Sequence, residues 1–158
     1  MSKFGNIEVI TGSCNVSTVK DGRGALFSWV PKEPILEFNL VLYTQGKIRG
    51  NHCHPEFNEY ILIVDGTFSL LTKHPETDEE MAMIASKGSC FYIPQGVPHA
   101  LVASSNSTLV SFLTKPWEEC EQPILREELV PQDIDYSNYA KKQGFVHSAE
   151  EIRKKKES

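Results

Sequence analysis

The stretch GKIRGNHCHPEFNEYILIVDG, residues 46–66, decides the fold. Two candidate strands, Ile48–His54 and Tyr60–Val64, flank Pro55 in this stretch. Asp65-Gly66 separates the second of them from a further apolar run, which is a pattern typical of a β-hairpin. His52 and His54 are two residues apart, and alternate residues of a strand point to the same face of a sheet. The stretch therefore predicts antiparallel strands, with two imidazoles directed at one point.

The same pattern of short apolar runs and turn residues continues outward from this stretch to about Thr114. Their β-branched and aromatic residues predict an all-β sandwich or barrel. The expected strands are Ile7–Ile10, Ala25–Val30, Glu37–Thr44, Ile48–His54, Tyr60–Val64, Thr67–Leu71, Met81–Ala85, Cys90–Ile93, Ala100–Ala103 and Thr108–Leu113. The side chains expected to face the barrel interior are Phe38, Leu40, Ile61, Ile63, Phe91 and Ile93.

Length and composition exclude several classes of protein. The chain has 158 residues, of which 40% are hydrophobic and 23% charged, and these values are typical of one globular domain. A net charge of −5 argues against nucleic acid or an anionic membrane as the main partner. No apolar run is long enough to span a membrane, and the first residues do not resemble a secretory signal. We expect a cytoplasmic protein whose four cysteines are free thiols.

Composition changes after Pro116, where the chain becomes acidic and rich in proline. Ser148-Ala149-Glu150-Glu151 matches a helix-capping pattern before Ile152 and a basic run, which predicts a short terminal helix. We expect helix only after Pro131. The predicted organisation is an N-terminal strand or arm over 1–22, a barrel over 23–116, and an extension with a short helix over 117–158.

Four residues form the candidate metal site: His52, His54, Glu59 and His99. Glu59 opens the strand after Pro55, and His99 follows the rigid turn Pro94–Pro98, so both side chains can reach the point addressed by the two histidines. Three imidazoles and a carboxylate suit a divalent first-row metal such as Zn, Fe, Mn, Ni or Cu. The other two histidines of the chain are isolated in polar stretches and are not expected to bind it.

These residues resemble the two motifs of the cupin family. Gly46-x5-His52-x-His54-x4-Glu59-x6-Gly66 fits the first motif at every fixed position, and Gly88-x5-Pro94-x-Gly96-x2-His99 fits the second. Ala103 stands where the second motif often has Asn, which is not a ligand in the family. The resemblance implies a small antiparallel β-barrel of jelly-roll type with the metal ligands inside, often in a homodimer.

Two arginine elements are similar to segments of cupins that act on sugar nucleotides. Arg49-Gly50-Asn51-His52 resembles the Arg-Gly-x-His element, and Asp21-Gly22-Arg23-Gly24 resembles an Asp-x-Arg-Gly segment. The resemblance implies that Arg49 and Arg23 hold the diphosphate of a nucleotide-linked sugar, and that His52 is the base beside the keto group. A complete ligand set instead makes His52 a ligand, and an imidazole or a carboxylate such as Glu59 near the metal then moves the proton.

Three functions remain open on this reading. The first is a metal-dependent isomerase or epimerase that acts on a sugar or a nucleotide-linked sugar, and the arginine elements favour it. The second is an Fe(II)-dependent oxygenase, which uses the same ligands. The third is a cupin that binds a small molecule without turnover.

Overall fold

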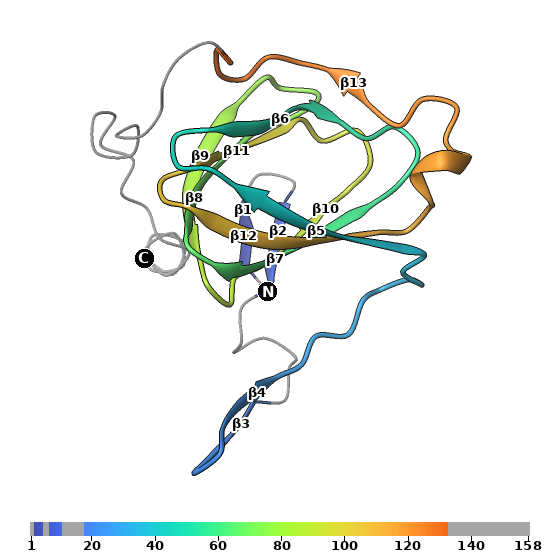
Figure 1. Ribbon diagram of the computed structural model, residues 1–158. Coiled ribbons are helices and arrows are strands. Elements are labelled where there is room, and N and C mark those ends of the chain that lie inside the picture. Colours follow the sequence, from blue (N-terminus) through green and yellow to red (C-terminus); the bar gives the residue numbers. More distant parts are fainter. Residues whose placement is uncertain (1, 5–6, 11–17, 133–158) are drawn as a thin grey trace.

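Two antiparallel β-sheets packed face to face form the body of the protein (Figure 1). The computed structural model describes residues 2–4, 7–10 and 18–132. One sheet has the order β1 (Ser2–Phe4), β2 (Ile7–Ile10), β10 (Cys90–Ile93), β7 (Glu59–Asp65), β12 (Ser107–Leu113), β5 (Glu37–Tyr43). The other has the order β13 (Leu125–Arg126), β6 (Ile48–Cys53), β11 (His99–Ala103), β8 (Thr67–Lys73), β9 (Glu80–Ser86). The all-β prediction, with a cupin-like jelly roll, is confirmed.

A third, two-stranded sheet stands apart from these two. Its strands, β3 (Thr18–Asp21) and β4 (Gly24–Phe27), form a hairpin that projects away from the body of the molecule (Figure 1). Residue 23, where the barrel was expected to start, lies in the turn of this hairpin. The first strand of the two large sheets after the hairpin is β5.

The core lies between the two large sheets. Strand β12 shows the alternation that places it there, because every second residue from Ser107 to Leu113 is buried. Ile61, Ile63, Phe91 and Ile93 are buried as expected. The prediction for Phe38 and Leu40 is wrong, since these side chains are 73% and 66% exposed on the outer face of β5.

The turn at Asp65-Gly66 is present, but the hairpin predicted from it is wrong. Strand β7 pairs with β10 and β12, whereas β8 pairs with β9 and β11 in the other sheet. Gly66 has a φ of +84°, and a Cβ there would lie 2.0 Å from the Ser107 hydroxyl oxygen. This glycine therefore carries the chain around a tight corner from one sheet to the other.

Helix and strand content differs from expectation in a few places. Strands β1, β3 and β13 were not expected, and a 3₁₀ helix at Trp117–Glu119 contradicts the prediction of helix only after Pro131. The predicted terminal helix lies outside the described residues.

Within the described ranges, no helix is long and apolar enough to cross a membrane. Cys53, Cys90 and Cys120 are free thiols, as predicted.

Candidate metal centre and cavity

Three of the four predicted ligands come together between the sheets. His52 lies in β6, His54 follows the end of that strand, and His99 opens β11 as the register partner of His52. One ring nitrogen from each of the three histidines lies within 4.8 Å of the other two. His54 and His99 are buried, and His52 is partly exposed. The three rings are thus positioned to share one ion.

A glycine makes this convergence possible. Gly50 has a φ of +101°, and its pairing with Ala100 lies beside a register shift between His99 and Ala100. A Cβ on Gly50 would lie 2.7 Å from the carbonyl oxygen of His99, which is closer than real Cβ atoms approach backbone. The Arg-Gly-x-His element therefore needs its glycine so that β6 can approach the strand that carries His99.

Glu59, the fourth predicted ligand, joins the cluster through two of the histidines. Its Oε2 atom lies 3.2 Å from Nε2 of His54 and 3.4 Å from Nε2 of His99. Its Oε1 atom accepts a hydrogen bond of 2.5 Å from the hydroxyl of Ser111. The carboxylate is buried, so its position is fixed from both oxygens.

The hydrogen bonds of the Nδ1 atoms of His54 and His99 show whether each Nε2 atom faces Glu59 as a donor or as an acceptor. Nδ1 of His54 lies 3.0 Å from the carbonyl oxygen of Pro123, and Nδ1 of His99 lies 3.0 Å from that of Val97. A carbonyl only accepts, so each Nδ1 carries the hydrogen. In a neutral ring Nε2 then presents a lone pair to Glu59 Oε2, which is also an acceptor.

Two facing acceptors need a positive charge between them. Apart from these two rings, no described residue donates a hydrogen bond to Glu59 Oε2. Either a proton converts a ring to imidazolium, or a metal ion takes the lone pairs. Metal-binding histidines commonly donate the other ring N–H to a backbone carbonyl, as both do here, so the residues fit a metal.

The electrostatics of the cluster favour a central cation. Burial raises the pKa of Glu59, but its contacts with His54 and His99 outweigh burial, and the pKa falls well below its usual range. Burial lowers the pKa of His54, but the contact with Glu59 outweighs it and the pKa is raised. Burial and the neighbouring rings of His99 and His54 lower the pKa of His52 to about 3. The cluster therefore holds an ionised carboxylate beside a neutral His52 ring.

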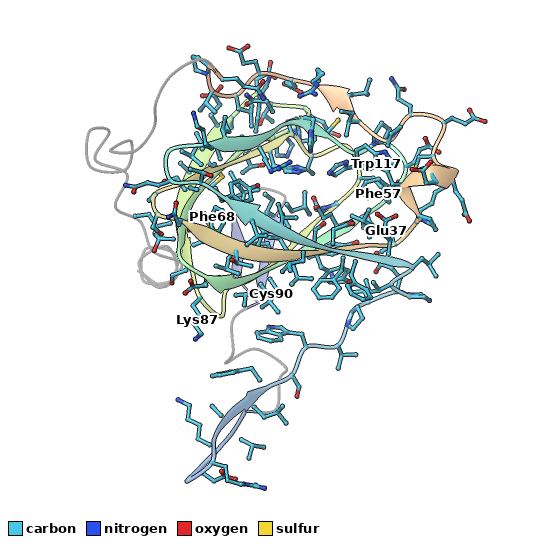
Figure 2. All side chains as sticks on the ribbon, in the orientation of Figure 1. Glu37, Phe57, Phe68, Lys87, Cys90 and Trp117 are labelled. Atoms are coloured by element: carbon cyan, nitrogen blue, oxygen red, sulfur yellow. The ribbon has the colours of Figure 1, made fainter. Side chains whose placement is uncertain are left out.

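The cluster forms part of the wall of a cavity of about 410 Å³. Glu37, Phe57 and Trp117 lie at one end of it, and Figure 2 shows them together at one end of the body. The His54 ring stacks on Phe57 at 4.3 Å between centroids and meets Trp117 edge-on at 6.4 Å. A small molecule that enters past these aromatic rings would therefore reach the histidines.

Two polar residues that contact or face the cluster, Tyr43 and Ser111, are among the cavity residues that were not predicted from the sequence. Tyr43, at the end of β5, is buried and packs edge-on against Phe68 at 4.8 Å. Burial and the charge of Glu59 raise the pKa of Tyr43, so its hydroxyl keeps its proton at neutral pH. Ser111 was also not predicted, and it lies on β12 beside Glu59. Both would follow from the strand period once the inward face of each strand is known.

The two predicted substrate arginines lie in different places. Arg49 lines the cavity, and its guanidinium carbon lies 5.8 Å from the centre of the Tyr43 ring. Arg23 lies in the turn of the β3–β4 hairpin, where its Nη2 pairs with Oδ2 of Asp21 at 2.6 Å, and it does not line this cavity. The structure thus joins Arg49 to the histidine cluster and leaves Arg23 apart from it.

His74, which was not expected to bind metal, lies outside the cluster. Its Nδ1 accepts hydrogen bonds from the backbone N–H groups of Glu76 and Thr77 in a loop. His147, the other histidine set aside, lies outside the described residues.

Solved structures with the same fold include two 3,4-ketoisomerases and a 3,5-epimerase. A 3,4-ketoisomerase from Helicobacter canadensis has a TM-score of 0.66 at 14% identity, over 78% of this chain and 92% of that one. A 3,4-ketoisomerase from Thermoanaerobacterium thermosaccharolyticum, solved with TDP-4-keto-6-deoxyglucose, has a TM-score of 0.62 at 18% identity, over 92% and 100%. A dTDP-4-dehydrorhamnose 3,5-epimerase from Sulfolobus tokodaii has a TM-score of 0.65 at 16% identity, over 84% and 85%. At these identities the likeness shows the fold alone.

Sequence comparison gives the family directly. No curated protein matches the chain. The model of the cupin family matches residues 31–129, which is well over half of the chain and includes both motifs. The chain therefore belongs to the cupin family, as the spacing of its histidines, glutamate and glycines predicts.

Proposed function

We propose that the protein is an isomerase or epimerase that moves a proton beside the keto group of a nucleotide-linked sugar. The observation that carries this proposal is the composition of one cavity, in which Arg49 and Tyr43 line the same space as the histidine cluster. Its volume of about 410 Å³ is in the range of small-molecule sites. The fold shared with ketoisomerases and an epimerase supports the same reading.

Substrate binding is assigned first to Arg49. A guanidinium is always charged near neutral pH and offers paired N–H donors, which suit the oxygens of a diphosphate. Arg49 lies on the cavity wall, in the strand that also carries His52. Arg23 remains a prediction from the sequence, since the hairpin holds it outside the cavity of its own chain.

We also propose that one divalent transition metal, such as Zn, Fe, Mn or Ni, is bound by His52, His54, His99 and Glu59. A bound metal of this kind acts as a Lewis acid that polarises a carbonyl oxygen. The support lies in the chain itself, because the Pro123 and Val97 carbonyls orient two rings with their lone pairs inward, toward the buried Glu59 carboxylate.

Proton transfer is assigned to the side chains that face the cavity. His52 is the most accessible ring of the cluster, and its lowered pKa keeps the ring neutral with a free lone pair, while the same shift makes the ring a weaker base. Glu59 is ionised, and it either ligates with His54 and His99 or takes the proton itself. Tyr43 keeps its hydroxyl proton and can donate a hydrogen bond to an oxygen that gains charge. His52 cannot be a ligand and the base at the same moment, so the two roles require separate tests.

The experiment is solvent exchange with a keto-sugar nucleotide. The protein is incubated in D₂O with TDP-4-keto-6-deoxyglucose, and deuterium on the sugar is followed by mass spectrometry, for metal-loaded and chelator-treated samples. We expect deuterium on a carbon beside the keto group, and a lower rate in a His52→Asn variant than in a His74→Asn variant. Exchange only after metal loading would favour the ligand role of His52, and exchange only after chelation would favour the base role. Oxygen uptake with Fe(II), or tight binding with no exchange, would contradict the isomerase.

A further inference from the structure

The segment that follows β12 passes beside the histidine cluster. It runs from Lys115 through the 3₁₀ helix to β13 and is drawn in orange in Figure 1. We call residues 115–126 the covering segment. Its two ends are held independently of each other, because the backbone N–H of Trp117 donates to Oε2 of Glu37 at 2.7 Å, and β13 pairs with the end of β6.

The middle of the covering segment is held by His54 and Glu56, which are two residues apart in the chain. Nδ1 of His54 donates to the carbonyl oxygen of Pro123 at 3.0 Å. Oε2 of Glu56 accepts a hydrogen bond of 2.5 Å from the backbone N–H of Gln122, which is the residue before Pro123. Oε1 of Glu56 pairs with Nζ of Lys115 at 2.8 Å. A ligand ring and a nearby carboxylate therefore grip the same two residues of the segment.

The contact with Glu56 fixes the carbonyl that orients the His54 ring. In residues 121–123, the hydrogen bonds to other parts of the described chain go to His54 and Glu56 alone. Little backbone freedom lies between the Gln122 N–H and the Pro123 carbonyl, because the proline ring fixes its own φ and restricts the residue before it to extended backbone. Loss of the Glu56 carboxylate would therefore release the Pro123 carbonyl from its place beside the ring.

We propose that Glu56 is a positioning residue for His54, and that it acts through Gln122 and Pro123. The inference rests on the metal site of the proposed function, in which the Nε2 lone pair of His54 faces the cation. Glu56 does not line the cavity that contains the cluster, so its effect has to pass through the covering segment. Loss of an outer partner of a ligand ring commonly lowers metal affinity by about 10- to 100-fold.

The first test is zinc affinity, measured by competition with a chelator. Glu56→Ala removes the acceptor, and we expect it to weaken zinc binding by roughly 10-fold or more. Glu56→Gln removes the charge but keeps an oxygen that can accept the Gln122 N–H, so it should restore most of the affinity. Gln122→Pro removes the donor and keeps every charge, so it should weaken zinc binding as Glu56→Ala does.

Two control variants separate the hydrogen bond from charge. Glu121→Ala removes a carboxylate from the same segment, where it is exposed and, in the described part of the chain, forms no hydrogen bond or ion pair. Lys115→Met removes only the partly exposed ion pair of Glu56, and such pairs contribute little. Both controls should bind zinc like wild type. The two held ends of the segment should keep every variant folded, and thermal melting checks this.

The second test does not depend on zinc. NMR of metal-free protein that is isotope-labelled in histidine reports the Nδ1 proton of His54, and a His54→Ala variant identifies its signal. Because this proton is hydrogen-bonded to the Pro123 carbonyl, it should exchange slowly with water in wild type and Glu56→Gln. It should exchange rapidly in Glu56→Ala and Gln122→Pro.

The outcomes distinguish this inference from the proposed metal site. Wild-type zinc affinity in both Glu56→Ala and Gln122→Pro, or slow exchange of the His54 proton in both, overturns the positioning role. Equal zinc loss in Glu56→Ala, Glu56→Gln and Glu121→Ala overturns it too, because charge alone would then explain the effect. If wild type binds no zinc, the metal site is wrong; the positioning role then stands if Glu56→Ala speeds exchange of the His54 proton, and is overturned if it does not.

Discussion

Replacing Gly50 by Ala tests the idea that one glycine lets the two histidine-bearing strands converge. The φ of +101° disfavours any residue with a Cβ, at a cost of about 1 to 2 kcal/mol. In addition the new Cβ would lie 2.7 Å from the His99 carbonyl oxygen and 2.9 Å from the Ala100 Cα. Both are backbone atoms that a rotamer change cannot move, and relief of such overlap costs about 1 to 3 kcal/mol. We expect Gly50→Ala to lower the free energy of unfolding by about 2 to 5 kcal/mol.

Gly88→Ala is the matched control for this prediction. Gly88 also has a positive φ, +86°, but nothing lies within 4 Å of the position its Cβ would take. We expect only the backbone penalty there, about 1 to 2 kcal/mol. Urea unfolding gives the free energy of unfolding of both variants. Zinc affinity is measured separately, on the folded variants in buffer without urea. Gly50→Ala should weaken zinc binding and Gly88→Ala should not. Equal destabilisation by both variants, or unchanged zinc affinity in Gly50→Ala, would refute the reasoning.

Three of the remaining predictions concern the same site, and one concerns a buried thiol outside it. Ser111→Ala removes the donor to Glu59 Oε1, and because a hydrogen bond to a charged group contributes about 1.5 to 3 kcal/mol, urea unfolding should show a loss of that size. Metal occupancy, measured by equilibrium dialysis, should be full at mildly alkaline pH and should fall as the pH drops through neutrality. The reason is that the raised pKa of His54 lets protons displace the metal from this ring before the solution is strongly acidic. Occupancy that stays constant down to pH 5 would argue against His54 as a ligand. Burial raises the pKa of Cys90 to about 12, so its thiol should resist iodoacetamide at pH 8 in the folded protein and react after unfolding, which mass mapping will show. Arg49→Lys should raise the KM for a nucleotide-linked sugar while leaving metal content unchanged, because lysine keeps the charge and loses the paired donors.

The sequence predicted the parts of the site that depend on local spacing. His52 and His54 share a strand face because the side-chain period is two, and His99 is positioned by a turn rich in proline and glycine. Their convergence could be foreseen because turn residues fix where each strand begins. Glu59 was foreseen for the same reason, as the first residue of β7.

The predictions that were wrong concern which face of a strand points into the barrel. In β5 the outward side chains are Phe38, Leu40 and Leu42, and all three are apolar. The inward set includes the polar Glu37 and Asn39 beside Val41 and Tyr43, so hydrophobicity favoured the wrong face. Tyr43 was missed as a cavity residue because the wrong face of β5 was taken as internal.

Long-range contacts of the C-terminal segment were also beyond local reasoning. The side chain of Asn51, which is at a φ of 55°, donates to the Val130 carbonyl at 2.7 Å and accepts from the N–H groups of Leu129 and Val130. This contact spans 79 residues along the chain, and no periodicity signals it. It ties the segment after β13 to β6, beside the site.

Metal stoichiometry tests the central claim most directly. Wild type, His54→Ala, His99→Ala and His74→Asn are loaded with Zn²⁺, desalted exhaustively and analysed by inductively coupled plasma mass spectrometry. The account predicts one zinc per chain for wild type and for His74→Asn, and a strong loss of zinc for His54→Ala and His99→Ala, because each of these two removes a ring whose lone pair faces the centre of the cluster. Stoichiometric zinc in His54→Ala and His99→Ala, or none in wild type under any loading condition, would contradict it.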